Sequence, residues 1–202
     1  YVFHISQVRS AVYCGRQAYY KSRREACRVP SPETRVLREV AYLYPTLVES
    51  PDDAVRRASE TAGVSASLDL GDAAQRLCET RNNRPSVWDD VARPDREERY
   101  LEGERLRGTV EKLSFGEGGV TVSVVKTGEP PARGVWNSER VEAAAVGRLA
   151  STVGDVNRVV VEYPRTGAVR ELNVGKDDEH TLDRALGTLE EVEEGVPPAR
   201  TD

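Results

Sequence analysis

Three ionisable side chains are spaced so that two strands and a helix would bring them together. Glu111 lies in the first of two strand patterns joined by a glycine-rich turn, Lys126 closes the second, and Glu142 follows in a helical pattern. A lysine that ends a Val-rich strand is costly to bury unless a carboxylate or a phosphate pairs with it. We therefore take Glu111, Lys126 and Glu142 as the candidate site and expect their side chains to meet at one end of a sheet.

The elements that position these residues follow from the period of the hydrophobic pattern. Helices are expected at about 5–24, 32–44, 51–63, 71–81, 139–152 and 178–193, and strands at 98–102, 105–115, 119–126, 156–163 and 168–174. Residues 81–97 are expected to form a loop. This order predicts an α+β fold (an α/β sandwich), in which N-terminal helices precede a mixed β-sheet core flanked by helices. We expect one domain over 1–202, with a helical part at 1–97 and the sheet core at 98–194.

Helix ends are marked by serine and proline residues. Ser6, Ser50 and Ser138 are placed to cap the helices that follow them, because a serine oxygen can accept from the first backbone N–H groups. Pro45 is expected to end or kink the second helix.

Composition places the chain among globular proteins. It has 202 residues, 38% hydrophobic residues, 31% charged residues and a net charge of −5. Its apolar runs are shorter than a bilayer span of about 18 residues, so a cytoplasmic protein without a membrane partner is expected. The chain starts at Tyr1 and contains no Met, which suggests a piece of a slightly longer protein.

Cysteine usage indicates a reducing compartment. The three cysteines (Cys14, Cys27 and Cys78) form no CxxC pair, so this sequence alone carries no complete zinc or cluster site.

The N-terminal segment is basic, whereas the last 26 residues are strongly acidic. Four arginines are candidates for contacts with a phosphate backbone, namely Arg9, Arg16, Arg23 and Arg24. The alternative for each of them is a solvated helix face.

Several stretches together resemble a known nuclease superfamily. They are Ser6 to Tyr20 around Cys14, Gly108 to Glu111, Val124 to Gly128 with Lys126 before Thr-Gly, Arg140 to Ala144 around Glu142, and the tyrosine–proline hairpin through Glu162 to Pro164. This pattern resembles the PD-(D/E)XK nucleases. More narrowly, it is similar to the RecB-like exonucleases, which include the CRISPR-associated fourth Cas protein and the nuclease half of a eukaryotic helicase–nuclease.

The resemblance implies metal-dependent hydrolysis of DNA that is single-stranded or has ends. Glu111 and Glu142 would hold Mg²⁺ or Mn²⁺, and Lys126 would orient or stabilise the reacting groups. Cys14 would be one ligand of a four-iron four-sulfur cluster, but only if further cysteines follow Asp202. The implied partners are DNA and other CRISPR or DNA-repair proteins.

The departures from the family pattern concern the metal ligands. Glu111 replaces an aspartate, Val124 replaces the second metal-binding acid, and Glu142 replaces a glutamine. The family's histidine has no counterpart, because residues 21–105 contain none. Glu142 could supply the missing carboxylate from the helix, or it could form a structural ion pair with Lys126 that needs no metal.

Three readings of the function therefore stay open. The first is a DNA exonuclease with a degraded catalytic set. The second is a catalytically inactive nuclease-like module that binds DNA or a partner. The third is a plain α+β scaffold. Val124, which replaces the second metal-binding acid, favours the second reading.

Overall fold

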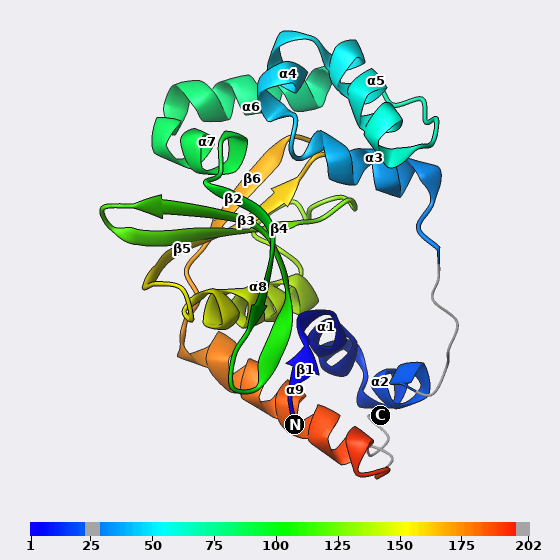
Figure 1. Ribbon diagram of the computed structural model, residues 1–202, viewed down its shortest axis with the longest axis vertical. Coiled ribbons are helices and arrows are strands. Elements are labelled where there is room, and N and C mark those ends of the chain that lie inside the picture. The colour runs from blue at the N-terminus through cyan, green and yellow to red at the C-terminus, as the bar shows by residue number, and fades with distance from the viewer. Residues whose placement is uncertain (23–28, 197–202) are drawn as a thin grey trace.

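The computed structural model describes residues 1–22 and 29–196, and these residues form an α+β fold in which helices cover both faces of a mixed sheet (Figure 1). The strands are β1 (Phe3–His4), β2 (Arg96–Glu102), β3 (Leu106–Gly116), β4 (Gly119–Val125), β5 (Val156–Tyr163) and β6 (Ala168–Leu172). The helices are α1 (Ile5–Tyr13), α2 (Gly15–Ser22), α3 (Pro32–Val40), α4 (Tyr44–Glu49), α5 (Pro51–Ala62), α6 (Gly71–Asn83), α7 (Pro85–Ala92), α8 (Asn137–Ala150) and α9 (Lys176–Glu193).

Strand β3 organises the sheet because both of its edges are used. Strand β2 runs antiparallel along one edge, opposite residues 107–113. The other edge is shared between β1, which is parallel and pairs at 106–107, and β4, which is antiparallel and pairs at 112–116. Residues 108–111 therefore have no strand partner on that second edge. We call this opening between β3 and β4 the fork.

A glycine permits the close approach of α1 to the fork. Gly108 has a φ of +153°, and a Cβ built there would lie 2.6 Å from Ile5 Cγ1. A side chain at residue 108 would push the first turn of α1 away from the sheet.

Two hydrophobic layers lie on opposite faces of the sheet. On one face α1, α8 and α9 pack on sheet residues that include Val122, Val124 and Val161. On the other face α3 to α7 pack on Val125 and Val160. The helical segment expected at 1–97 is thus divided between the two faces, which Figure 1 shows as separate layers above and below the strands.

The periodicity-based predictions of β2 to β6 and of α5, α6, α8 and α9 are confirmed to within a few residues. The expected loop at 81–97 is wrong, because Pro85 begins the helix α7. Trp88 in this helix is buried. Pro45 likewise lies in the first turn of α4 rather than ending a helix. Proline suits a first turn because the N–H that it lacks would have no partner there. Both prolines therefore mark helix starts.

The single helix expected at 5–24 is also corrected, because Cys14 is extended, with φ −166° and ψ 116°, and separates α1 from α2. The cap of α1 is His4 instead of Ser6, since His4 accepts from Ser6 N while Gln7 accepts from His4 N. At α8 the N-cap position belongs to Trp136 instead of Ser138. Ser50 does precede α5, but its side chain forms no capping hydrogen bond.

A lysine buried in the sheet ties one of these layers, that of α3 to α7, to the strands. Lys112 Nζ donates to Glu162 Oε2 on β5 at 2.7 Å, to Ala41 O after α3 at 2.7 Å and to Val91 O on α7 at 2.6 Å. Both charged side chains are almost completely buried. Burial lowers the pKa of Lys112, and the carboxylate of Glu162 opposes that shift. The ammonium thus joins β3, β5 and two helices of one layer.

Lys112 reaches that layer because the strand alternation is interrupted. Val110 and Leu113, three residues apart, both pack in the core formed with α1, α8 and α9. In a regular strand residues of one face are two apart. The interruption turns Lys112 toward α3 and α7 and leaves Glu111 at the fork.

Removal of one partner of this pair is expected to be strongly destabilising. Lys112→Met should lower the free energy of unfolding by about 3–5 kcal/mol, because it leaves the Glu162 carboxylate buried without its cation. The double variant Lys112→Met/Glu162→Gln should recover part of that loss, which urea unfolding of the two proteins measures. Equal losses in the single and double variants would show that the two charges are not coupled.

Candidate functional site

The three side chains expected to form the site do converge at the fork. Lys126 follows β4 directly, and its Nζ lies 2.7 Å from Glu142 Oε2 on α8. Glu111 Oε2 accepts from Val125 N at 3.5 Å, on the edge of β4 that β3 has left. Lys126 and Glu142 are both close enough to perturb the pKa of Glu111. The expected convergence of the three side chains at one end of the sheet is therefore confirmed.

A fourth charge completes the cluster and was not expected. Arg38 on α3 places Nη2 at 3.3 Å from Glu111 Oε1, with its own side chain 56% exposed and that of Glu111 13% exposed. No sequence signal marks Arg38, which is one of several charged residues on the polar face of α3. We call Glu111, Lys126, Glu142 and Arg38 the charge quartet.

The quartet balances two carboxylates with two cations. Glu142 Oε2 is buried and has Lys126 as its ion-pair partner, without a well-oriented hydrogen bond from the described residues. Lys126 N donates to Glu162 O at 2.8 Å, which fixes the backbone from which the side chain leaves. The site is therefore supported by strands β4 and β5 of the sheet. Helix α3 of one layer and helix α8 of the other contribute Arg38 and Glu142.

Burial controls the acidity of Glu111. Desolvation raises its pKa above the ordinary value of 4.5, the charges of Lys126 and Arg38 oppose this shift, and Glu142 adds to it. The amide of Val125 also favours the ionised form. The net direction is upward, so Glu111 holds its proton to a higher pH than an exposed glutamate.

The fit of a resident divalent metal ion to these residues depends on which carboxylate oxygens are free. In 1–22 and 29–196 no group of three or more His, Cys, Asp or Glu side chains could hold a metal ion. Val124, at the position of the expected acid, is buried in the core with α1 and α8 and offers no oxygen. Because Mg²⁺ needs free carboxylate oxygens together with water, the pairing of Glu111 with Arg38 and of Glu142 with Lys126 leaves it a poor donor set.

The other candidate residues lie outside the quartet. Arg9 and Arg16 are exposed on α1 and α2, whereas Arg23 and Arg24 fall outside the described residues. Cys14 is partly exposed at the break between α1 and α2, and both helices contact α9, the last helix described (Figure 1).

Two comparisons with known proteins were negative. No protein-family model matches the chain, and a search of curated proteins finds no match. Among the described residues no helix has the length and apolarity to cross a bilayer. The interpretation of function therefore rests on the geometry at the fork.

The raised pKa of Glu111 predicts a pH-dependent contribution to stability. The folded state binds this proton more tightly than the unfolded chain, so the contribution is fully present below pH 4.5 and is lost as the pH rises through the folded pKa. In Glu111→Gln that dependence should be absent. The stability of the wild type relative to the variant should thus fall between pH 4 and the raised pKa, as urea unfolding at several pH values measures. If the stability of the wild type relative to Glu111→Gln rose with pH instead, the upward direction of the Glu111 pKa shift would be contradicted.

Proposed function

We propose that this chain is a divergent RecB-like protein of the PD-(D/E)XK superfamily that binds DNA without hydrolysing it. The observation that carries the proposal is the Lys126–Glu142 ion pair at 2.7 Å, in the place where the nuclease pattern would put a metal ion. The resemblance is supported by the placement of its motifs, because Glu111 lies on β3, Lys126 ends β4 and Glu142 lies on α8.

The ion pairs within the quartet explain why the site would be catalytically inactive. In metal-dependent phosphodiester hydrolysis the ion activates water and stabilises the leaving oxygen. Here Glu142 neutralises Lys126, and Arg38 pairs with Glu111. The four groups satisfy one another, so none of them is poised to activate water.

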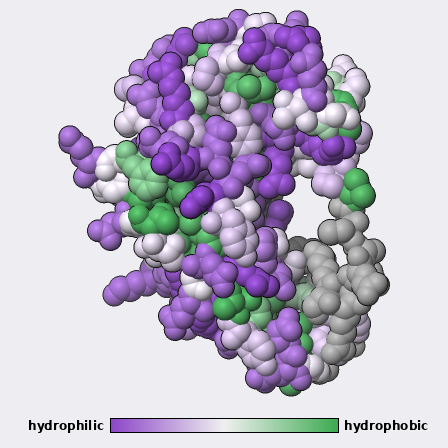
Figure 2. All heavy atoms as spheres, in the orientation of Figure 1, coloured by the Kyte–Doolittle hydropathy of each residue, from purple (hydrophilic) through white to green (hydrophobic). Residues whose placement is uncertain are grey.

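DNA binding would rest on arginines at the surface. Arg9 and Arg16 are exposed, and Arg38 lies half-exposed at the rim of the fork. Figure 2 shows that hydrophilic side chains dominate the α3–α7 layer on the side of the molecule facing the viewer. Contacts of arginine with phosphates carry no sequence information and weaken with salt. We therefore expect salt-sensitive binding without sequence preference.

The test of the silent site restores the missing acid. Val124→Asp should give Mn²⁺-dependent cleavage of single-stranded DNA that the wild type lacks, because it adds a carboxylate beside Glu111 and Lys126. Val124→Asn is the matched control, since it buries a similar polar group without the charge. The expected accompanying effect is a modest loss of stability in both variants. No cleavage by Val124→Asp, with DNA binding unchanged, would show that the defect extends beyond residue 124.

A second candidate function is an active exonuclease in which Glu142 replaces the missing acid. The convergence of Glu111 and Glu142 on Lys126 favours it, because DNA or metal binding could separate the ion pair. In that case the wild type would cleave DNA in Mn²⁺ and Glu142→Gln would abolish the activity. This result would replace the proposal of a silent site.

The cluster proposal concerns Cys14 and applies only if cysteines follow Asp202. In the natural protein purified without oxygen, Cys14→Ala should then lose iron, because it removes one thiolate ligand. Cys78→Ala is the matched control and should retain the iron content of the wild type. An iron-free, colourless wild type would contradict the proposal.

A further inference from the structure

A second polar site lies beside the fork at the same end of the sheet. It is a cavity of about 640 Å³ between α6, the turn that joins β5 to β6, and residues 129–132. Strands β4 and β5 are parallel, and both end at this side. Residues 129–132 follow Lys126 closely in the chain, so the cavity and the charge quartet share one connecting segment. Ligands of sheet proteins commonly bind beyond the carboxyl ends of parallel strands.

Most side chains that could bind a ligand in this cavity are hydrogen-bond donors. The lining includes Arg76, Asn83, Arg84 and Arg170. Two carboxylates, those of Glu79 and Glu129, also line it, and both residues are exposed. Donors are therefore the larger share of the polar side chains around the cavity.

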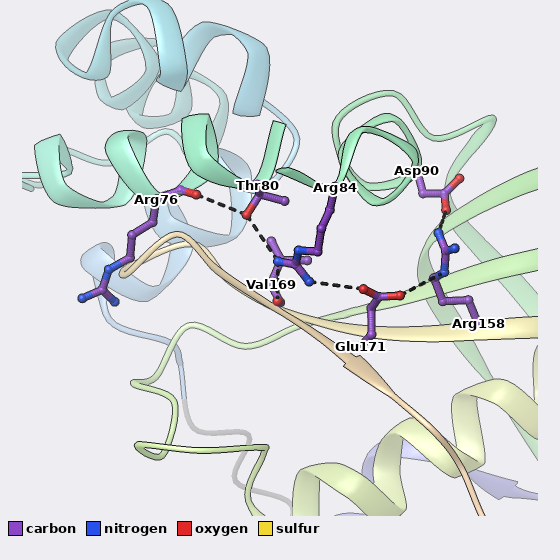
Figure 3. Close-up of polar contacts among 7 residues, drawn as sticks. All are labelled: Arg76, Thr80, Arg84, Asp90, Arg158, Val169 and Glu171. Atoms are coloured by element: carbon purple, nitrogen blue, oxygen red, sulfur yellow. Dashed lines mark hydrogen bonds and ion pairs between the residues drawn. The ribbon is translucent and has the colours of Figure 1, made fainter. Parts of the chain in front are cut away.

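Arg84 is the fixed wall of the cavity. Its Nη1 donates to Glu171 Oε1 at 3.2 Å, and its Nη2 donates to Val169 O at 3.2 Å. Glu171 is also paired with Arg158, whose Nη1 lies 2.8 Å from Asp90 Oδ2 (Figure 3). This chain of contacts ties α7 to β6 and uses up the charge of Arg84.

Arg76 and Arg170 are not used in this way. In Figure 3 the guanidinium of Arg76 points away from the network of Arg84, and it forms no hydrogen bond or ion pair within the described residues. Arg170 Nε is buried and has no hydrogen-bond partner there. The charge of Arg170 is felt by Tyr163, whose hydroxyl donates to Glu139 Oε2 at 2.6 Å. A buried guanidinium N–H without an acceptor is costly. Arg170 also lines the cavity, so an anion there would give its guanidinium a charged acceptor.

The cavity wall is rigid at the turn between β5 and β6. Gly167 has a φ of +67°, and a Cβ at this residue would lie 2.1 Å from Ala73 O on α6. Only glycine allows the turn to pack so closely on the helix. This contact therefore fixes the spacing between the turn and α6, which form two sides of the cavity.

We propose that this cavity binds a phosphate group through Arg76 and Arg170. Planar guanidinium groups match phosphate oxygens in geometry and charge, and the volume is sufficient for one nucleotide. The phosphate has two possible sources, the 5′ end of a DNA strand or a free nucleotide. The first source rests on the proposed function of DNA binding, whereas the second does not.

The experiment compares two oligodeoxynucleotides of one sequence, labelled at the 3′ end and carrying a 5′ phosphate or a 5′ hydroxyl. The proposal expects the double variant Arg76→Gln/Arg170→Gln to bind the phosphorylated strand about 10-fold more weakly than the wild type, by fluorescence anisotropy. Arg81→Gln is the matched control, because Arg81 is exposed on α6 but does not line the cavity. Arg76→Gln alone serves if the double variant fails to fold, with a smaller loss expected.

Competition with ATP and with inorganic phosphate separates the two sources. Displacement of the phosphorylated strand by ATP in the wild type, with ATP binding lost in the double variant, would assign the cavity to a free nucleotide. If ATP and inorganic phosphate both compete only weakly with the phosphorylated strand, the cavity is assigned to the 5′ end of DNA.

Unchanged affinity of the double variant for the phosphorylated strand would overturn the phosphate site while leaving DNA binding intact. A wild type that binds ATP through these arginines but binds neither strand would support the cavity and overturn the proposed function.

Discussion

The buried ion pair between Lys112 and Glu162 is the interaction on which the arrangement of the site depends. An ammonium group in the interior needs acceptors on several sides, and here they come from the end of α3, from α7 and from β5. Satisfying Lys112 fixes the α3–α7 layer to the sheet. It also brings Arg38 on α3 over Glu111, the residue next to Lys112 in the strand.

The same constraint accounts for the position of Glu111. The interruption of strand alternation that sends Lys112 into one layer leaves its neighbour at the fork, where β4 ends and α8 passes. In this position Glu111 meets cations from two elements, and Glu142 meets Lys126. A set of two carboxylates and two cations is complete without a metal ion, which distinguishes this fork from the two-carboxylate site that the nuclease pattern implies.

Much of this architecture could be predicted from local pattern. Alternation in the Val-rich strands and the helical spacing around Glu142 were sufficient for the convergence of the candidate site. Proline was misleading, because Pro45 and Pro85 mark helix starts as readily as helix ends, and only the burial of residues such as Trp88 decides between them. The break at Cys14 had no clear local signal beyond the glycine after it.

Two contacts were not predicted, the Lys112–Glu162 pair in the sheet and the Arg38–Glu111 pair in the quartet, and the reasons differ. Lys112 carried a usable signal, since a lysine among alternating apolar residues and a glutamate in the Val-rich strand β5 both need buried partners. The contact of Arg38 depends on how α3 crosses the sheet, and a tertiary crossing leaves no trace in the sequence of one helix.

The central claim is that Lys126 and Arg38, instead of a metal ion, neutralise the carboxylates at the fork. Titration of the wild-type protein with Mn²⁺, followed by electron paramagnetic resonance of the free ion, tests it most directly. The account predicts that Mn²⁺ stays free, with the same curve for the wild type and for Glu111→Gln. Stoichiometric binding by the wild type that is lost in Glu111→Gln would contradict it and would establish a metal site at the fork.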